Sequence, residues 1–308
     1  MSRILVIGSS NTDMVIRVPE LPRPGETVLG GEFTINGGGK GANQALAAAR
    51  AGGAVTFLAR VGDDDFGRRA LDSLGAAGID TGPCIVDADS PSGVAQILVD
   101  AHGENCIAVA PGANARLVPG DLAAAADHFL AGSIVLLQLE TPLATVQAAL
   151  ARARDAGCRT LLNPAPAQPL PEELLALVDL LTPNESEAEH LTGIAVSDDA
   201  SAAAAADALH RQGVATVLLT RGARGVFLSE AAAGGGQRAF PAFAVSAVDS
   251  TAAGDVFNGC LVAALAEGRD LAGAIPFAQA GAALSVQRPG AQDSVPERAA
   301  IEAFLRAA

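Results

Sequence analysis

The sequence predicts an α/β fold: a mostly parallel central sheet covered by helices on both faces, with a small β-sheet lid at one edge. Short, continuous apolar runs alternate along the 308 residues with longer, Ala-rich segments of helical length. Continuous apolar runs are typical of parallel strands that are buried on both faces. Two strand-rich segments with polar turns interrupt this pattern, and they predict the lid. We expect residues 1–308 to form a single domain.

The expected elements of the central body follow from these runs. The strands are short and rich in Val, Ile and Leu: Ile4–Gly8, Val55–Ala59, Ile134–Leu139, Thr160–Asn163, Leu177–Leu181, Thr216–Thr220 and Val226–Ser229. The helices between and after them are rich in Ala, which suits close packing of a helix on a sheet. They are Ala42–Ala51, Phe66–Ala76, Leu122–Leu130, Pro142–Ala156, Glu185–Leu191, Ala200–Gln212, Gly254–Ala266, Leu271–Val286 and Glu297–Arg306.

Residues 11–36 and 92–110 supply the expected lid strands. The first segment has strand-like runs at 15–18 and 27–29 around a turn with two prolines and a glycine. The second has two apolar runs around the polar turn 101–105, which is typical of a β-hairpin. Strands inserted in this way favour a sheet that stands over the ligand edge of the body. Its outer apolar side chains would need a partner surface; they are taken from Val94, Ile97, Val99, Ile107 and Val109.

Composition and charge exclude several classes of function. Half of the residues (50%) are hydrophobic, which is too many for a disordered chain. The net charge of −14 makes non-specific binding to nucleic acid or to an anionic membrane unexpected. No apolar run approaches the ~18 residues needed to span a bilayer, and no signal peptide is visible. We therefore expect a soluble, cytoplasmic protein whose four scattered cysteines are reduced and buried.

The strongest local signal for chemistry is the segment 249–259, D-S-T-A-A-G-D-V-F-N-G. Small residues precede a helix that starts near Gly254, and they leave its free N–H groups open to an anion. Asp255 in the first turn could simply compensate the helix dipole. Beside open N–H groups it can instead accept a hydroxyl proton while those groups hold a phosphoryl charge. The dipole is expected to lower the pKa of Asp255 and to keep it ionised.

A second signal is the run N-G-G-G-K-G-A-N at 36–43. It is not a Walker loop, because no Ser or Thr follows the lysine, and no strand is expected directly before it. A flexible turn is one interpretation. The other is a ligand site, since glycines beside Lys40 and Asn43 at a helix start make the backbone approachable.

Two further loops allow both a structural and a functional interpretation. Asn184 followed three residues later by Glu187 is typical of a helix cap. The segment T-R-G-A-R-G at 220–225 joins two strands, and it suits nucleotide phosphates as well as an ordinary hairpin. Local sequence does not decide between these alternatives.

Together, these segments resemble the signatures of the ribokinase-like (PfkB) carbohydrate kinases. The resemblance rests on G-G-K-G-A-N at 38–43 and A-A-G-D at 252–255, and shorter matches extend it over nearly the whole chain. They are Ser10–Asp13, Pro24–Thr27, Gln138–Glu140, Asn163–Pro166, Thr182–Glu185 and Gly290–Gln292. The resemblance implies a ribokinase-like fold and ATP-dependent phosphorylation of D-ribose at its 5-hydroxyl. It also implies Mg²⁺, activation by K⁺ and a homodimer joined through the lids.

The resemblance further implies a role for individual positions. Asp255 would be the base, and the anion hole would be formed by Ala252, Ala253 and Gly254. The sugar would be held by Asn11, Asp13, Gly39, Asn43 and Glu140, with Lys40 beside them. Asn184 and Glu187 would lie near Mg²⁺ and phosphate, and Gln279 near the adenine. The nucleotide would be flanked by Thr220, Arg221, Gly222, Ala223, Arg224 and Gly225. A monovalent-cation site would be formed by Asp249, Thr251, Ser285, Arg288, Gly290 and Ser294.

The residue types at the implied sugar site favour a neutral substrate. Carboxylates and amides hydrogen-bond a free polyol well and repel a sugar phosphate. Kinases of deoxyribose, fructose or a nucleoside remain alternatives, although a chain with ten Phe and no Tyr or Trp has few residues to stack a base. A non-catalytic sugar-binding protein on the same fold is a further alternative. Asp255 and the small residues before it argue against that one.

Overall fold

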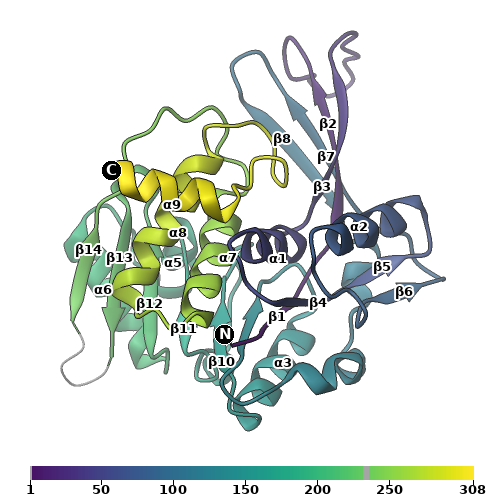
Figure 1. The fold of residues 1–308 in the computed structure, drawn as a ribbon. Helices are drawn as coiled ribbons and strands as arrows, with labels where there is room; N and C mark the ends of the chain where they lie inside the picture. Colours follow the sequence, from purple (N-terminus) through teal and green to yellow (C-terminus); the bar gives the residue numbers. More distant parts are fainter. Residues whose placement is uncertain (1, 232–235) are drawn as a thin grey trace.

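The computed structural model describes residues 2–231 and 236–308. It contains an eight-stranded sheet flanked by helices, and a separate four-stranded sheet that projects from this body (Figure 1). The predicted fold class, an α/β body with a small β-sheet lid, is confirmed. No helix within the described ranges is long and apolar enough to cross a membrane.

The large sheet has the strand order β14-β13-β12-β11-β10-β9-β1-β4. Neighbouring strands from β4 to β12 run parallel, and β13 and β14 are added antiparallel at one edge. The parallel strands are β1 (Ile4–Ile7), β4 (Val55–Leu58), β9 (Ile134–Leu137), β10 (Arg159–Leu162), β11 (Leu180–Leu181) and β12 (Thr216–Thr220). The antiparallel pair is β13 (Val226–Glu230) and β14 (Gln237–Phe240). All parallel strands therefore end at the same edge.

Helices cover both faces of this sheet because its side chains alternate between two cores. In β1, Ile4 and Val6 enter one core, whereas Leu5 and Ile7 enter the other. The first core is closed by α1 (Lys40–Arg50), α2 (Asp65–Ala76), α7 (Ala253–Ala266), α8 (Leu271–Ser285) and α9 (Arg298–Ala307). The second is closed by η2 (Pro119–His128), α3 (Leu143–Asp155), α4 (Glu172–Leu175), α5 (Glu185–Thr192) and α6 (Asp199–Arg211). Two short 3₁₀ turns complete the helical segments, η1 (Gly112–Arg116) and η3 (Gly222–Arg224).

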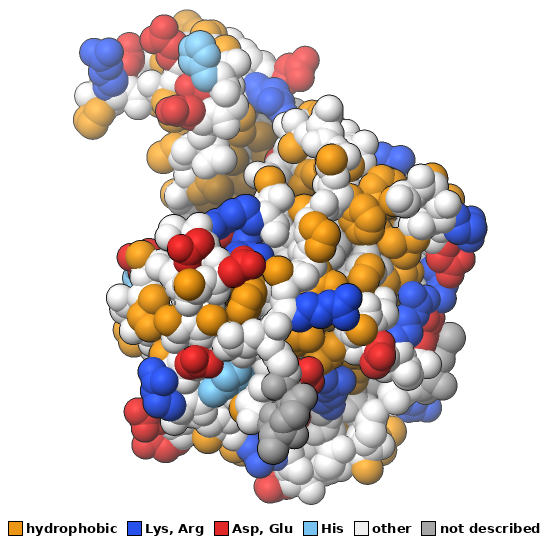
Figure 2. Space-filling model, turned by 90° about the vertical axis from the view of Figure 1, so that its left-hand side faces the viewer, with side chains coloured by type: hydrophobic (Ala, Val, Ile, Leu, Met, Phe, Trp, Pro, Cys, Tyr) orange, Lys and Arg blue, Asp and Glu red, His pale blue; other side chains and the backbone are white. Residues whose placement is uncertain are grey.

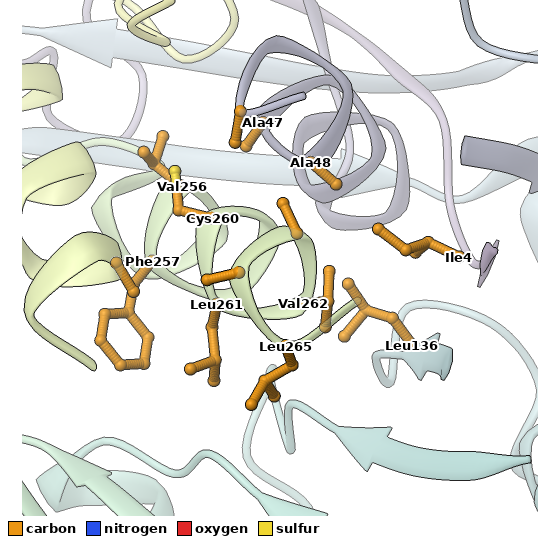
Figure 3. Close-up of a cluster of buried hydrophobic side chains, with 14 of the residues drawn as sticks. Ile4, Ala47, Ala48, Leu136, Val256, Phe257, Cys260, Leu261, Val262 and Leu265 are labelled. Carbon is orange, nitrogen blue, oxygen red and sulfur yellow. The ribbon is translucent and has the colours of Figure 1, made fainter. Parts of the chain in front are cut away.

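Close packing of α1 on α7 brings the two glycine- and alanine-rich helix starts together. Figure 3 shows Ala47 and Ala48 of α1 facing Val256 and Cys260 of α7 above the sheet. A β-carbon at Gly259 would lie 2.6 Å from the carbonyl oxygen of Gln44, so the two backbones approach each other as closely as they can. This contact fixes where the first turn of α7 lies relative to α1.

The four-stranded sheet, called the lid below, has the order β3-β2-β7-β8. Its strands are β2 (Asn11–Arg17), β3 (Phe33–Gly38), β7 (Gly93–Val99) and β8 (Asn105–Ala110). Figures 1 and 2 show it standing out from the body. The two predicted segments do form this sheet, but the predicted strand at 27–29 is wrong. The second strand lies at Phe33–Gly38 and therefore runs directly into the glycines before α1.

The register of the lid shows which side chains share a face, because directly opposed residues point to the same side. Asp13 pairs with Asn36 and Ala95, and two residues further on Val15 pairs with Ile97. The face with Asp13 also carries Val99, Ile107 and Val109. The prediction of these residues as an outer face is wrong, because they continue the inner, Asp13-bearing face. Val94 alone of the predicted set lies on the opposite face.

Other differences from the expected elements are local. The prediction of an α-helix at 122–130 is wrong: residues 122–128 belong to the 3₁₀ helix η2, which is kinked at Ala125 and buries few large side chains, and residues 129–130 lie beyond its end. The strand expected at 177–181 is reduced to Leu180 and Leu181, and β14 was not expected. Strands β5 (Arg60–Gly62) and β6 (Ile85–Asp87) form a separate pair. Cys106 is exposed on β8 and Cys84 only half-buried, contrary to expectation.

Candidate active site

The candidate site lies where the carboxyl ends of the parallel strands, the base of the lid and the starts of α1 and α7 meet. Ligands of open α/β sheets bind outside the carboxyl ends of the strands. Hydrogen bonds join the segments that converge there: Ser9–Asp13, Gly39–Gln44, Gln138–Glu140 and Ala252–Asp255. Residues far apart in the sequence thus surround one small polar region.

Asp255 is buried, with 6% of its surface exposed. Asn43 Nδ2 donates to its Oδ2 over 3.0 Å, and Gln44 Nε2 donates to its Oδ1 over 2.8 Å. Burial raises the pKa of Asp255 above the ordinary value of a carboxyl, and the charge of Lys40 and the two amide hydrogen bonds oppose this only in part. The expectation of a lowered pKa is therefore wrong, because burial raises the pKa by more than Lys40 and the two amides lower it.

The implied sugar-binding residues are brought together. Glu140 accepts hydrogen bonds from Ser9 Oγ over 2.6 Å and from the backbone N–H of Lys40 over 3.0 Å. Asn114 Nδ2 donates to Asn11 Oδ1 over 2.8 Å and so orients that amide. Gly39, with φ 87°, lies against the backbone of Asn11. The convergent set comprises Asn11, Asp13, Gly39, Lys40, Asn43, Glu140 and Asp255.

Acidic groups dominate the charge of this region. Burial, reinforced by the carboxylates of Glu140 and Asp255, raises the pKa of Asp13 from 3.8 to about 6. Burial also raises the pKa of Glu187. For Lys40, burial alone would lower the pKa, but the four surrounding carboxylates outweigh it and the pKa is raised. Lys40 is thus held as a cation among Asp13, Glu140, Glu187 and Asp255.

Replacing Asp13 by Asn tests this charge balance through the pH dependence of stability. The carboxyl has a higher pKa in the folded protein, so its ionisation destabilises the fold above about pH 4 and fully above about pH 6. Asp13→Asn should raise the unfolding free energy by up to about 3 kcal/mol at pH 8, with the gain growing between pH 4 and 6. Urea unfolding of the ligand-free protein measures it. A gain that is equal at pH 4.5 and pH 8 would contradict this explanation.

The start of α7 has the geometry of an anion site. Ala252 is the one non-glycine residue in the described ranges with a left-handed backbone, φ 58°. That conformation costs an L-residue about 1–2 kcal/mol, and such strain is concentrated at functional sites. No side chain of the described residues caps this helix. The N–H of Ala253 donates to Ser250 O over 3.2 Å, whereas those of Ala252, Gly254 and Asp255 have no acceptor in the described parts of the chain and are left open to a ligand.

Residues implied at the nucleotide are only partly brought together. Asn184 and Glu187 form a reciprocal cap, with Glu187 N donating to Asn184 Oδ1 and Asn184 N to Glu187 Oε2, each over 2.8 Å. Thr220 lies beside Asn184 in an isolated parallel bridge. The guanidinium groups of Arg221 and Arg224, in contrast, bind the carboxylates of Asp199 and Glu185. The arginine heads are thus occupied by ion pairs, and Gly222 and Ala223 lie with Arg224 in the 3₁₀ turn η3, which Gly225 follows.

Gln279 and the implied cation residues are held by backbone contacts. Gln279 Nε2 donates to the carbonyl of Pro241 over 3.1 Å, which ties α8 to the segment after β14. Asp249 accepts from the N–H groups of Thr251 and Gly290, each over 2.9 Å, and joins two loops beside α7. Burial would raise the pKa of Asp249, but hydrogen bonding by the Thr251 side chain and by these two N–H groups outweighs it, and the pKa is lowered.

The remaining cation residues close the same pair of loops. The N–H of Arg288 donates to the carbonyl of Ser285 over 3.0 Å, and Ser294, which is buried, donates to Ala291 O. Within residues 2–231 and 236–308, no three His, Cys, Asp or Glu side chains are grouped as metal ligands. Any cation held here would bind a single carboxylate, hydroxyls and backbone carbonyls.

Comparison with known proteins decides the family. The model of the pfkB family carbohydrate kinases matches residues 1–298. The chain belongs to this family. It is 45% identical to a ribokinase of Haemophilus influenzae over 98% of both chains, and 38% identical to a deoxyribokinase of Salmonella typhi over 95% of both. The structure of an Arabidopsis thaliana ribokinase complexed with ribose and ATP superimposes with a TM-score of 0.91, at 31% identity and 99% coverage of both chains.

Membership of the pfkB family confirms the resemblance derived from the two glycine-rich signatures and the predicted enzyme class, a carbohydrate kinase. Six amide side chains that were given no role from the sequence hold the signature residues in place; five of them are buried and Gln292 is half-buried. They are Gln44, Asn114, Gln138, Asn163, Asn258 and Gln292. A polar residue at the end of an apolar strand was an available signal for Gln138 and Asn163. The other amides lie in loops or helices, where the local sequence pattern gives no sign of such a role.

Proposed function

We propose that this pfkB-family kinase transfers the γ-phosphoryl group of ATP to the 5-hydroxyl of D-ribose. The observation that carries the proposal is the buried Asp255 carboxylate, held by two amides directly beside the open first turn of α7. Relatives named ribokinase at 45% identity, and a related structure complexed with ribose and ATP, support ribose as the sugar and ATP as the donor.

The sugar would lie between the base of the lid and the start of α1. Its hydroxyls would bind the oxygens of Asp13 and Glu140 and the amides of Asn11 and Asn43, close to the backbone of Gly39. Four carboxylates against one lysine suit a neutral sugar and disfavour a sugar phosphate. The lid, whose β2 follows β1 after Gly8–Ser10, would cover the sugar from above.

Asp255 would act as the general base during transfer. As the bond between the sugar oxygen and the γ-phosphorus forms, the hydroxyl proton passes to Asp255, the bond to the β-phosphate oxygen breaks and ADP leaves. The raised pKa makes the ionised carboxylate a better proton acceptor than an exposed one. The N–H groups of Ala252, Gly254 and Asp255 would hold the charge on the transferring group.

ATP would lie along the carboxyl edge from the start of α7 to η3. Its phosphates would meet Gly254 and the Asn184–Glu187 cap, and its nucleoside would lie near the turn 220–225 and Gln279. Glu187 suits Mg²⁺, because it is a carboxylate only 6% exposed that lies within the electrostatic reach of Lys40 and Asp255. When bound, Mg²⁺ would neutralise phosphate charge.

Steady-state kinetics on a set of sugars tests the substrate. We expect kcat/KM for ribose to exceed the values for 2-deoxyribose, fructose and adenosine by at least about tenfold, because a site built to bind a hydroxyl rejects the analogue lacking it. The deoxyribose arm matters most, since a deoxyribokinase is among the relatives. A larger kcat/KM for any of the other three would assign that compound as the substrate instead.

We further propose that the loops 249–251 and 285–294 hold K⁺. The available donors are the Asp249 carboxylate, the Ser294 hydroxyl and the backbone carbonyls of Thr251, Ser285, Arg288 and Gly290, a set of oxygens that suits a monovalent cation. Such a cation would stabilise the loop that leads into Ala252, without touching the sugar.

Activity in different salts checks the cation proposal. At matched ionic strength, kcat/KM in K⁺ should exceed that in Na⁺ or Li⁺ by at least about fivefold, a coupling typical of an allosteric ion. Asp249→Asn should remove most of this difference, because it removes the one carboxylate of the site. Equal rates of the wild-type enzyme in all three salts would exclude a functional K⁺ site.

We also propose that the lid joins two copies of this chain. Ile107 and Val109 on its inner face are 53% and 51% exposed, and they continue the apolar row that starts beside Asp13. A second lid packed on this row would cover it and close the sugar site of each copy.

One domain with inserted lid strands is the organisation that we propose for residues 1–308. We propose that the protein acts in the cytoplasm, because its proposed phosphoryl donor is ATP.

Light scattering at micromolar concentration checks the dimer. The wild-type protein should show twice the 30.7 kDa mass of the chain, and Ile107→Glu combined with Val109→Glu should show the monomer mass, because buried charges without partners are costly. Val86→Glu is the matched control, since Val86 is equally exposed at 53% but lies outside the lid on β6. A monomeric wild-type protein would contradict the proposal.

A further inference from the structure

A chain of buried amides links the end of β11 to the carboxylate of Asp255. Asn163 Nδ2 donates to the backbone carbonyl of Thr182 over 3.1 Å. Gln44 Nε2 donates to Asn163 Oδ1 over 3.0 Å and to Asp255 Oδ1 over 2.8 Å. Thr182, Asn163 and Gln44 are all buried. Three side chains from three elements thus form one continuous hydrogen-bonded path.

The direction of every hydrogen bond in this path follows from its first member. A backbone carbonyl can only accept, so Asn163 must turn its NH₂ group to Thr182 and its oxygen to Gln44. Gln44 must then turn its NH₂ group to Asn163, and the second hydrogen of that group faces Asp255. The carbonyl of Thr182 therefore dictates that Gln44 offers a donor, not an acceptor, to the carboxylate.

The fixed orientation of Gln44 also explains an unpaired atom nearby, the amide oxygen of Gln138. Gln138 Nε2 donates to Gln44 Oε1 over 2.6 Å, which leaves Gln138 Oε1 buried with no hydrogen-bond partner in the described parts of the chain. Such an atom is costly and requires an explanation. If the Gln138 amide turned over, its oxygen would face the oxygen of Gln44. Gln138 can therefore donate to Gln44 Oε1 only in the orientation that leaves its own Oε1 unpaired.

Thr182 also contacts α7 through its side chain. Asn258 lies in α7, and its NH₂ group donates to the carbonyl of Gly254 one turn earlier over 2.8 Å, which turns its oxygen towards Thr182. Thr182 Oγ1 donates its hydrogen to that oxygen over 2.7 Å and holds the amide in place. The carbonyl and the hydroxyl of one residue thus lead to the carboxylate and to the open turn beside it.

We propose that Thr182 anchors a positioning network, made of Gln44, Gln138, Asn163 and Asn258, that sets the orientation of the Asp255 carboxylate and of the anion-binding turn. Gln44 and Asn258 act directly on these groups, while Asn163 and Gln138 act through Gln44. The network's role in catalysis rests on the proposed kinase function. The network's effect on the proton affinity of Asp255 does not depend on that function.

Two variants and a control test the network. Gln44→Met keeps the shape but removes the donor to Asp255. Gln138→Met removes both the unpaired oxygen and one of the two contacts that orient Gln44. Thr145→Val is the control: its buried hydroxyl donates to Leu117 O over 2.6 Å, and neither residue belongs to the network. Loss of that bond has a structural effect alone.

The acidic limb of the kcat–pH profile is the first readout. Removing a donor from a carboxylate disfavours its ionised form, so the pKa of Asp255 rises and the limb moves to higher pH. For Gln44→Met we expect a shift of about one pH unit, the size typical of a hydrogen bond to a charged group, and at least about a tenfold loss of kcat. The charged neighbours Lys40, Asp13, Glu140 and Glu187 are unchanged in every variant.

Gln138→Met separates positioning from structure. It should shift the limb in the same direction and lower kcat, while its melting temperature should stay close to that of the wild type. The unpaired oxygen of Gln138 is gone, but Gln44 Oε1 loses its donor, so one buried oxygen is unpaired in either protein. Thr145→Val should melt at a lower temperature with an unshifted limb. An unshifted limb in Gln44→Met, or a Gln138→Met variant that loses stability but not kcat, would overturn the proposal.

A second readout remains if the enzyme does not phosphorylate ribose. Carboxyl ¹³C-NMR titration of Asp-labelled protein, with the Asp255 signal assigned from its loss in Asp255→Asn, reports the pKa without any substrate. The network predicts an upward shift in Gln44→Met and none in Thr145→Val. Absence of ribose turnover would then refute the proposed function alone, whereas an unshifted Asp255 signal would refute the network.

Discussion

Replacing Asp255 by Asn is expected to lower kcat by a factor on the order of 10²–10⁴, the usual effect of losing a general base. The amide has nearly the same size, but it cannot accept the hydroxyl proton as the new O–P bond forms. Binding of sugar and ATP should change far less, because Asn11, Asp13, Glu140 and the nucleotide-side residues are intact. Calorimetric titration of the variant with each ligand measures this.

A matched substitution separates chemistry from helix stability. Asp270 caps the start of α8 by accepting from Gly273 N over 2.8 Å, so Asp270→Asn makes the same change at another helix start. It should leave kcat unchanged, since Asn is an equally good cap. If Asp255→Asn kept more than about a tenth of the wild-type kcat, Asp255 would position the sugar or cap its helix, and the proposed mechanism would be wrong.

Gly39→Ala is expected to lower kcat/KM for the sugar by a factor on the order of 10². With φ at 87° and ψ at 130°, Gly39 has a backbone conformation that L-residues rarely adopt and that costs them about 1–3 kcal/mol. The added β-carbon would also lie 2.7 Å from Asn11 N and 2.9 Å from Ser10 Cα. These main-chain atoms cannot yield without moving the base of the lid, and displacements of about 1 Å at a site can cost 10²-fold.

Gly78→Ala is the control for backbone strain alone. Gly78 has φ 81°, but no atom outside its immediate surroundings in the chain lies within 4 Å of the position that a β-carbon would take there. Gly78→Ala should therefore lower stability through backbone strain alone and leave kcat/KM unchanged. Equal loss of kcat/KM in both variants would mean that general destabilisation, not displacement of Asn11, explains the effect of Gly39→Ala.

Local patterns in the sequence predicted the parts of this protein that are local in the structure. The continuous apolar runs indicated the parallel strands, and the small residues before Asp255 marked the open start of α7. The lid was recognised from its interrupting strands, but alternation alone does not say which face is inner. The register with Asp13, a contact between strands, placed Ile107 and Val109 on the inner face.

Features that depend on tertiary contacts were out of reach. Gln44 donates hydrogen bonds to Asn163 and Asp255, which lie 119 and 211 positions further along the sequence. Nothing in the sequence of its helix distinguishes it from a surface glutamine. The pKa of Asp255 was expected to fall because the dipole is visible in sequence, whereas the burial that raises the pKa is not. The ion pairs that occupy Arg221 and Arg224 likewise depend on how α5 and α6 pack beside η3.

The identity of the product tests the central claim most directly. Incubation with ribose, ATP and Mg²⁺ followed by proton-coupled ³¹P-NMR should yield ADP and one new phosphomonoester whose signal is a triplet, because phosphorus at the 5-position couples to the pair of protons on that carbon. Phosphorylation at carbon 1, 2 or 3 would give a doublet instead. A triplet that matches authentic ribose 5-phosphate is the predicted result; a doublet, or consumption of ATP without a sugar phosphate, would contradict the proposed function.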